Sequence, residues 1–557
     1  MLRSCISLIL FILVFCVKTT LAQEPLRSPF NFPIVLSGNF GELRSTHFHS
    51  GIDFKTQGVE GKPIHAVNDG YVSRIGVSPW GYGNALYIDH PDGTTTVYGH
   101  LKSFDSKIED YIKEQQYIQE SFAVNLYPDP EQFVFKRGDI IALAGNSGSS
   151  GGPHLHFEVR DTQTEDIIDP LLFYKDRVKD TQAPQAREII IYPFEAKGIV
   201  NGSSRPQKLR VAGRHIQEKI TAWGEIGLGI KAFDSMDGTS NIYGVKSISL
   251  TLDNDEIFHY DIERFAFDET RYINSFNDYD EWKNNRSKFI KCFVEPGNHL
   301  RFIRSKKYGI VTIDEERIYN FTYTLSDIFG NKTTLTVNIE GKKRDIPPVE
   351  TEGSVFFNRT SDNRFREKGI FLSIKKGNLY DSLNFRYSVK EDSTAISNTH
   401  ILHNKSIPLH QNGQLSLRVQ NDILENKKQY GIISIYKGKV SWIGGEFENG
   451  WVNADIRELG TYSVRTDTTA PKITPVNMNT WVQNRNIVFK ISDNLSGIKE
   501  YRGEINGEFI LFEFDGKKGL ISYKFDPQRL PKGTCNLTLT ATDACENKST
   551  FTHTFTW

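Results

Sequence analysis

Two short motifs contain residue types that hold catalytic zinc: H-x-H at His154 and His156, and H-x-x-x-D at His49 and Asp53. Two imidazoles and one carboxylate make three protein ligands and leave a coordination position for water. Because a metal ion of this kind lowers the pKa of bound water from about 16 towards ~7, such a site makes hydroxide available near neutral pH. The residue set therefore predicts hydrolytic chemistry.

The spacing of the two neighbouring histidines indicates a strand. Successive side chains of a strand point to opposite faces, so His154 and His156 would look into one groove while Leu155 points into a core. Residues 154–160 alternate polar with apolar, unlike the helix that carries the ligands in H-E-x-x-H proteins. A lone H-x-H pair is equally consistent with ordinary surface or core histidines, and the prediction depends on the rest of the set.

Two further segments complete the pattern. Tyr98-Gly99-His100-Leu101 ends an apolar strand, and the glycine-rich run 145–153 leads directly into the H-x-H pair. The order of these motifs resembles that of the lysostaphin and LytM-like zinc endopeptidases, which cut peptidoglycan cross-bridges. The resemblance covers about residues 30–175.

The resemblance implies a duplicated hybrid motif fold and a division of roles among the motif residues. His49, Asp53 and His156 would be the ligands of one zinc ion per chain, and His100 and His154 would be the catalytic histidines. One of these two would deprotonate or orient the water and the other would stabilise the oxyanion; the sequence does not assign which. The expected substrates are peptidoglycan cross-link peptides, either D-alanyl to diamino-acid or glycyl-glycine bonds.

Two other functions stay open at this point. Some relatives lose zinc ligands and act as non-catalytic regulators of other cell-wall hydrolases, although all five motif residues are present here. In a third interpretation the chain is a cell-surface adhesion protein, whose later β-domains dominate and bind protein partners.

The whole chain is predicted to be all-β, and residues 23–180 to form an antiparallel β-sheet metallopeptidase domain. Apolar alternation and turn residues mark strands at 71–76, 84–89, 94–101 and 140–144. Residues 102–135 form an insertion relative to the family pattern, with helical spacing over 105–116 and a strand at 121–127. We expect this insertion to be either a surface elaboration or a lid that narrows the groove.

An internal repeat divides the rest of the chain. The segment Asp-Thr-Gln-Ala-Pro at 180–184 recurs as Asp-Thr-Thr-Ala-Pro at 467–471, and Asp327-x-x-x-Asn331 recurs as Asp543-x-x-x-Asn547. Modules of short alternating strands that begin and end alike suggest Ig-like β-sandwiches. We place them at 181–345, which includes an aromatic insertion, and at 466–557. Residues 346–465 are predicted as a third β-rich domain, so two or three β-sandwich domains follow the peptidase domain.

Length, composition and charge place the chain among globular multidomain proteins. Its 557 residues exceed what one core supports, and 38% are hydrophobic. A formal net charge of -1 gives no support for a nucleic-acid partner. Residues 1–22 have a positive start, an apolar run and a small-residue end, which predicts a signal peptide, with an uncleaved anchor as the alternative. We therefore expect no transmembrane segment after signal removal and a location in the periplasm or cell envelope, or alternatively outside the cell.

Five cysteines are present, of which Cys5 and Cys16 would leave with the signal peptide. Cys535 and Cys545 lie in one small predicted module and could form a disulfide in an oxidising compartment. Such pairing would leave Cys292 as the odd cysteine.

Overall fold

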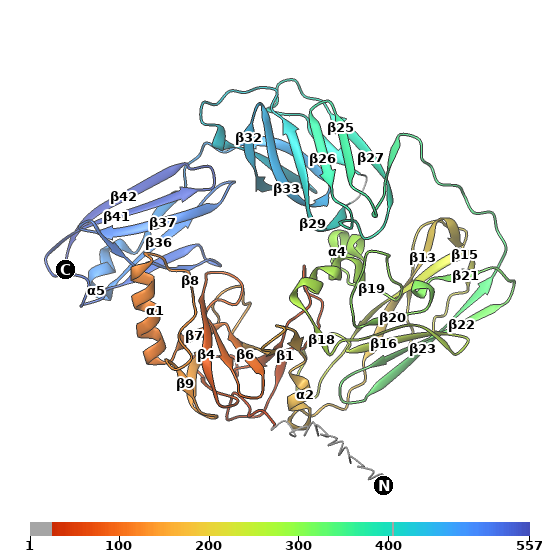
Figure 1. The fold of residues 1–557 in the computed structure, drawn as a ribbon, viewed down its shortest axis with the longest axis horizontal. Coiled ribbons are helices and arrows are strands. Elements are labelled where there is room, and N and C mark those ends of the chain that lie inside the picture. Colours follow the sequence, from red (N-terminus) through yellow and green to blue (C-terminus); the bar gives the residue numbers. More distant parts are fainter. Residues whose placement is uncertain (1–24, 404–405) are drawn as a thin grey trace, which may run out of the picture.

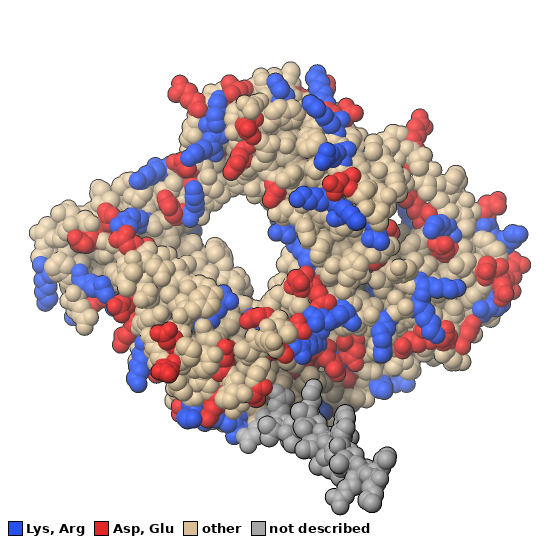
Figure 2. Space-filling model, in the orientation of Figure 1, with Lys and Arg blue, Asp and Glu red and all other residues tan. Residues whose placement is uncertain are grey.

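Four β-rich bodies form a closed ring in the computed structural model, which describes residues 25–403 and 406–557 (Figure 1). The space-filling view shows an opening through the middle of the ring (Figure 2). The predicted signal peptide lies outside the described residues. Within the described ranges, no helix has the length and apolarity to cross a bilayer.

The first body carries the predicted site on antiparallel sheets. Its main sheet has the strand order β1-β2-β11-β6-β5-β4-β8, and a smaller sheet has the order β3-β10-β7. The main-path strands are β1 (Leu36–Gly38), β2 (Ile52–Lys55), β4 (Gly70–Val77), β5 (Ala85–Asp89), β6 (Thr94–Gly99), β8 (Val124–Leu126) and β11 (His154–Asp161). The others are β3 (Pro63–His65), β7 (Leu101–Phe104), β9 (Val134–Phe135), β10 (Ile140–Ala144) and β12 (Ile167–Ile168), followed by α2 (Leu171–Tyr174) and η1 (Lys175–Arg177). The all-β prediction is confirmed.

The H-x-H pair lies on an inner strand of the main sheet. β11 pairs with β2 on one side and β6 on the other, so His156 lies opposite Asp53 and opposite Gly99. Leu155 is fully buried, as the alternation predicted. Register alone therefore places a histidine, an aspartate and the residue before His100 in one row.

The predicted insertion contains the one long helix of this body, α1 (Ser106–Ile118). Ile108 and Ile112 are buried on its inner face. Its outer face carries Lys113, whose Nζ lies 2.6 Å from Asp526 Oδ2, and Tyr117, which the Arg529 guanidinium covers at 3.9 Å from the ring centroid. The insertion is thus the docking surface for the last body, a role that neither sequence interpretation included.

The second body contains one continuous sheet of ten strands with the order β14-β13-β15-β23-β22-β16-β17-β20, to which β19 and β21 add on β15. Its strands are β13 (Gln185–Val200), β14 (Gln207–Arg210), β15 (Ile220–Phe233), β16 (Ser247–Leu252), β17 (Asp255–Asp261), β18 (Arg264–Phe265), β19 (Ile290–Lys291), β20 (Ile303–Ser305), β21 (Val311–Ile313), β22 (Ile318–Ser326) and β23 (Lys332–Gly341), with η3 (Lys307–Gly309) before β21. β18 pairs with β12 of the first body, and the two bodies share one buried core.

The aromatic insertion of the second body forms η2 (Phe267–Tyr272), α3 (Ile273–Phe276) and α4 (Tyr279–Asn285). These short helices contact the bodies on either side. Phe276 meets Phe48 of the first body edge to face at 5.6 Å between ring centroids. Tyr272 stacks on His410 of the third body at 4.3 Å. The insertion therefore joins three of the four bodies.

The third and fourth bodies each consist of two antiparallel sheets. The third has the orders β24-β27-β28-β34-β30-β31 and β25-β26-β29-β33-β32, and the fourth has β35-β36-β40-β39 and β38-β37-β41-β42. The third comprises β24 (Ser354–Phe357), β25 (Asn363–Glu367), β26 (Ile370–Ile374), β27 (Leu383–Lys390), β28 (Thr399–Leu402), β29 (Ile407–Arg418), η4 (Lys427–Gln429), β30 (Tyr430–Tyr436), β31 (Lys439–Gly444), β32 (Glu446–Glu448), β33 (Trp451–Leu459) and β34 (Thr461–Thr466). The fourth comprises β35 (Lys472–Val476), η5 (Met478–Thr480), α5 (Trp481–Asn484), β36 (Asn486–Ser492), β37 (Ile498–Ile505), β38 (Glu508–Ile510), β39 (Glu513–Asp515), β40 (Leu520–Lys524), β41 (Thr534–Asp543) and β42 (Lys548–Thr556).

The predicted disulfide between Cys535 and Cys545 is wrong. Both side chains are buried free thiols, as is Cys292. Cys535 lies near the start of β41 and Cys545 lies beyond its end. A strand rises about 3.3 Å per residue, so these two α-carbons are roughly 30 Å apart, far beyond the ~6 Å that a disulfide spans.

Closure of the ring should depend on the contacts of α1. The double variant Lys113→Ala/Tyr117→Ala removes an ion pair to a buried carboxylate and a cation–π contact, which together contribute about 2 kcal/mol or more. We expect the last body to detach and the radius of gyration in small-angle X-ray scattering to rise. Tyr127→Ala, in the same insertion but exposed, is the control. A scattering curve of the double variant that matches wild type would contradict this prediction.

Candidate metal centre

The three predicted ligands meet in a tight triangle. His49 Nε2 lies 3.1 Å from Asp53 Oδ1 and 3.1 Å from His156 Nδ1, and His156 Nδ1 lies 3.0 Å from Asp53 Oδ1. All three side chains are buried. Tetrahedral zinc, at about 2.0–2.1 Å from each donor, spaces its donors about 3.3 Å apart. The size and chemistry of the donor set therefore fit this ion.

Hydrogen bonds on the far side of each imidazole decide which nitrogen faces the triangle. His49 Nδ1 donates to the carbonyl oxygen of Asn39 at 2.7 Å, and His156 Nε2 donates to Glu158 Oε1 at 2.9 Å. In this tautomer each ring presents a nitrogen lone pair to the centre, and a proton held on that nitrogen instead would have to leave when a metal ion binds. Such outer partners orient metal-binding histidines and raise their basicity.

Glu158 is the anchor of this outer layer. It is fully buried, and Ser50 and Tyr82 donate hydroxyl hydrogen bonds to the same oxygen that accepts from His156. Its other oxygen accepts from Arg160 Nε at 2.7 Å. Sequence reasoning missed this residue, although it follows His154 and His156 on the same face of the alternating strand, and that position was the available signal.

The charges around the triangle favour a cation there. Burial raises the pKa of Asp53, but the His49 charge and hydrogen bonds from His156 and His49 outweigh it and hold that pKa well below its ordinary value. Burial lowers the pKa of His156, yet hydrogen bonds to Asp53 and Glu158 raise it to about 9. Two buried carboxylates thus stabilise positive charge at the point where the three donors converge.

The two predicted catalytic histidines flank the triangle. Their ring centroids lie 4.8 Å apart, and His154 Nε2 lies 3.5 Å from Asp53 Oδ1. His100 Nδ1 donates to the Ser147 carbonyl at 2.9 Å and His154 Nδ1 to the Gly152 carbonyl at 2.8 Å. Both rings are therefore held with Nε2 as the hydrogen-bond acceptor.

Burial keeps both flanking histidines neutral near pH 7. Burial, followed by the charges of His156 and His154, lowers the pKa of His100 to about 3, and burial also lowers the pKa of His154. His100 adopts a left-handed backbone with φ of 61°, which is unusual for a side chain of its size. A neutral imidazole with a free Nε2 lone pair can accept a proton from water.

The last body reaches the rim of this site, a contact that no sequence pattern predicts. Lys517 Nζ donates to the carbonyl oxygens of Asn146 and Ser150 in the glycine-rich loop before β11. Ser150 Oγ in turn lies 3.2 Å from His154 Nδ1. Lys517 of the fourth body is thus linked to the flanking His154 through Ser150.

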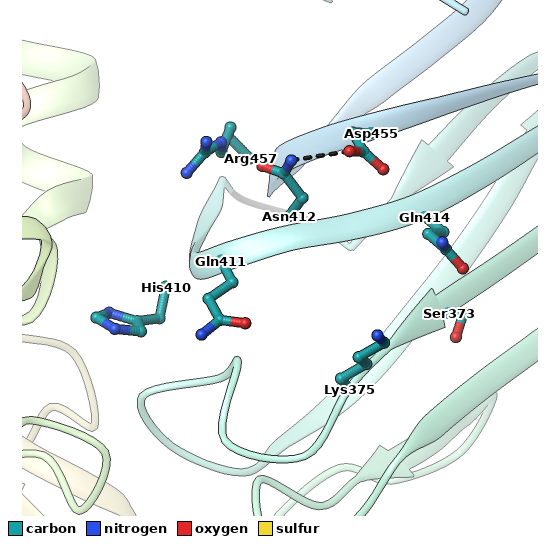
Figure 3. A pocket seen from close by; sticks show the side chains of 8 residues that line it. All are labelled: Ser373, Lys375, His410, Gln411, Asn412, Gln414, Asp455 and Arg457. Atoms are coloured by element: carbon teal, nitrogen blue, oxygen red, sulfur yellow. Dashed lines mark hydrogen bonds between the residues drawn. The ribbon is translucent and has the colours of Figure 1, made fainter. Parts of the chain in front are cut away.

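A cavity of about 390 Å³ lies elsewhere, on the third body (Figure 3). Polar and charged side chains of β26, β29 and β33 line it, and Asn412 donates to Asp455 at 2.8 Å. Among the described residues, none of the three-residue groups whose ligand atoms converge belongs to this cavity.

Two segments match known families. Residues 47–123 match the model of Peptidase family M23, and residues 354–467 match that of the Zu5-like domain.

Several known proteins are similar to part of the chain. DD-carboxypeptidase/endopeptidase Mpg of Neisseria meningitidis serogroup B is 32% identical over 118 residues, covering 21% of each chain. Peptidoglycan DD-endopeptidase ShyB of Vibrio cholerae is 35% identical over 111 residues, covering 20% of each chain. A solved zinc containing peptidase from Vibrio cholerae is 27% identical with a TM-score of 0.20, covering 27% of this chain and 40% of that one. The chain thus spans about a fifth of the length of the curated relatives.

Neutralising Glu158 should weaken the metal site without touching a ligand. In Glu158→Gln the hydrogen bond that orients His156 is weakened, so we expect zinc affinity to fall about 10- to 100-fold in a chelator competition assay. Glu165→Gln is the matched control, because Glu165 also pairs with Arg160 but is exposed. Equal zinc affinity in the two variants would contradict a positioning role for Glu158.

Proposed function

From its N-terminal Peptidase family M23 domain, homologous to the lysostaphin/LytM-like peptidoglycan endopeptidases, we propose that the protein is an exported, zinc-dependent endopeptidase. Its substrates would be the cross-link peptides of bacterial peptidoglycan. The observation that carries the proposal is the triangle of His49, Asp53 and His156 donor atoms, with edges of 3.0–3.1 Å and two neutral histidines beside it.

His49 Nε2, Asp53 Oδ1 and His156 Nδ1 would hold the zinc ion. Zinc bound there would supply Lewis acidity, lowering the pKa of water towards ~7 and polarising a peptide carbonyl. Asn39 and Glu158 keep the two ligand rings turned towards the centre. The buried setting excludes bulk water and strengthens each polar contact with the reacting groups.

His100 and His154 would manage the proton. The Nε2 lone pair of one ring accepts a proton from the attacking water, and the resulting imidazolium can donate a hydrogen bond or pass the proton to the leaving amine. Each such general acid–base step contributes about 10²- to 10⁴-fold in rate. The carbonyls of Ser147 and Gly152 hold both rings in the tautomer that this task requires.

We favour the D-alanyl to diamino-acid cross-link as the bond that is cut. Two matched relatives are a DD-carboxypeptidase/endopeptidase and a DD-endopeptidase, which supports this choice. Glycyl-glycine bridges are the alternative, because another relative, from Staphylococcus capitis, is a glycyl-glycine endopeptidase. Cell-wall substrates also imply an extracytoplasmic location, in agreement with the predicted signal peptide. The non-catalytic regulator is the alternative outcome of the tests that follow.

Removing a ligand and removing a flanking histidine should have different effects. We expect His156→Ala to lose both zinc and hydrolysis, whereas His154→Ala should keep zinc and lose about 10²- to 10⁴-fold in kcat. Zinc content by mass spectrometry and muropeptide release report the two quantities. His215→Ala, an exposed histidine of the second body, should leave both unchanged. A wild-type protein that binds zinc yet releases no muropeptides would instead support the regulator.

Substrate choice can be read from the products. Digestion of purified walls with D-alanyl to diamino-acid cross-links should convert cross-linked dimers into monomers, while walls with glycyl-glycine bridges should stay intact. Chromatography of the muropeptides measures both reactions in parallel. Cleavage of the glycine bridges alone would overturn the substrate assignment.

A further inference from the structure

Two groups of three aspartates recur in the second and fourth bodies. In the second body the group is Asp180, Asp234 and Asp327, and in each group the ligand oxygens all lie within 4.8 Å of one another. Asp180 precedes β13, while Asp234 and Asp327 directly follow β15 and β22. Three segments distant in sequence thus bring their carboxylates to one point.

The fourth body repeats the arrangement with Asp467, Asp493 and Asp543. The repeat extends to the local motifs, because each group combines an Asp-x-x-Ala-Pro, an Asp-x-x-x-Gly and an Asp-x-x-x-Asn segment. The asparagine plays the same part in both. Asn331 Nδ2 donates to Asp327 Oδ2 at 2.7 Å and to the Asp180 carbonyl at 3.3 Å. The corresponding distances from Asn547 Nδ2 to Asp543 and Asp467 are 2.8 and 2.9 Å.

Some carboxylate oxygens in these groups accept no hydrogen bond. Asp234 is only 2% exposed, and the one hydrogen bond to its carboxylate among the described residues comes from the Ser235 backbone nitrogen to Oδ1, which leaves Oδ2 without a donor. The buried Oδ2 of Asp180 and the buried Oδ1 of Asp493 also have no hydrogen-bond partner. Unpaired buried oxygens of this kind carry a large desolvation cost unless something binds them.

No positive side chain compensates the two groups. Within the described part of the chain, none of the six carboxylates forms an ion pair with lysine, arginine or histidine. Three carboxylates so close together repel one another strongly unless a cation lies between them.

We propose that each aspartate group is a calcium-binding site, so that the chain binds two Ca²⁺ ions in addition to the metal of the peptidase domain. All the ligand atoms in these groups are carboxylate oxygens, which suit hard cations such as calcium, whereas structural zinc sites are built mainly from nitrogen and sulfur. Calcium accepts six to eight oxygens in flexible geometry, whereas magnesium keeps several waters in a strict octahedron. A cluster of three converging carboxylates therefore suits calcium better.

Each site would fix the junction between two bodies. Asp180 lies in the segment that leaves the first body at η1, and Asp467 directly follows β34 of the third body. Calcium would tie each of these connecting segments to two strand ends of the body that follows. In the ring, the two ions would set the directions in which the second and fourth bodies leave their predecessors (Figure 1).

Calcium stoichiometry of the full chain tests the proposal directly. Chelator-treated protein is dialysed against buffered CaCl₂, and bound calcium is measured by mass spectrometry. We expect two equivalents in wild type, one each in Asp234→Asn and Asp493→Asn, and none in the double variant. Asp253→Asn, at an exposed turn of the second body, should keep two. Wild type that binds no calcium, or that binds magnesium more tightly, would overturn the assignment.

Thermal unfolding separates a cation site from a set of structural hydrogen bonds. Saturating Ca²⁺ should raise the Tm of wild type by about 3 °C or more, because the ion binds the folded state. Asp234→Asn should lose part of this rise, yet unfold at the same or a higher temperature than wild type without calcium, since one repelling charge is gone. A lower Tm in both conditions would show a purely structural role. Neither measurement requires hydrolysis, so the result is independent of the proposed peptidase activity.

Discussion

The register of β11 between β2 and β6 is the constraint on which the site depends. It places His156 opposite Asp53 on one side and opposite Gly99 on the other, and His100 follows Gly99 directly. A slip of one residue would turn His156 into the core and bring Leu155 to the groove. The fully buried Leu155, Phe157 and Val159 make such a slip costly, so the apolar face of the strand fixes the chemistry of the polar face.

Around this row, a hydrogen bond to one ring nitrogen of each of four histidines fixes the orientation of the ring. Asn39 and Glu158 orient the ligand rings, and the Ser147 and Gly152 carbonyls orient the flanking rings. Three of these four partners are backbone carbonyls, which hold their direction as long as the loops keep their shape. The orientation of the two flanking rings therefore depends on the glycine-rich loop that borders the site.

That loop is also where the ring closes. The fourth body contacts it through Lys517 and contacts α1 through Asp526 and Arg529. The site thus lies where the first and last bodies meet, although they are far apart in sequence. The aspartate groups also lie between bodies, because each one joins a connecting segment to the body that follows.

Local patterns were enough to predict the strand that carries His154 and His156 and the helix over 105–116. The roles of the five motif residues came from the resemblance to a known family and stay predictions. Alternation and helical spacing are properties of neighbouring residues, so the sequence alone determined them. Glu158, the orientation of each imidazole and the docking of Lys517 required the folded chain, because each depends on contacts between distant segments. The error about Cys535 and Cys545 has the same origin: closeness in sequence became a long separation once the intervening residues extended as a strand. The aspartate groups illustrate both cases, since the repeat was visible in the sequence but its convergence on one point was decided only by strand packing.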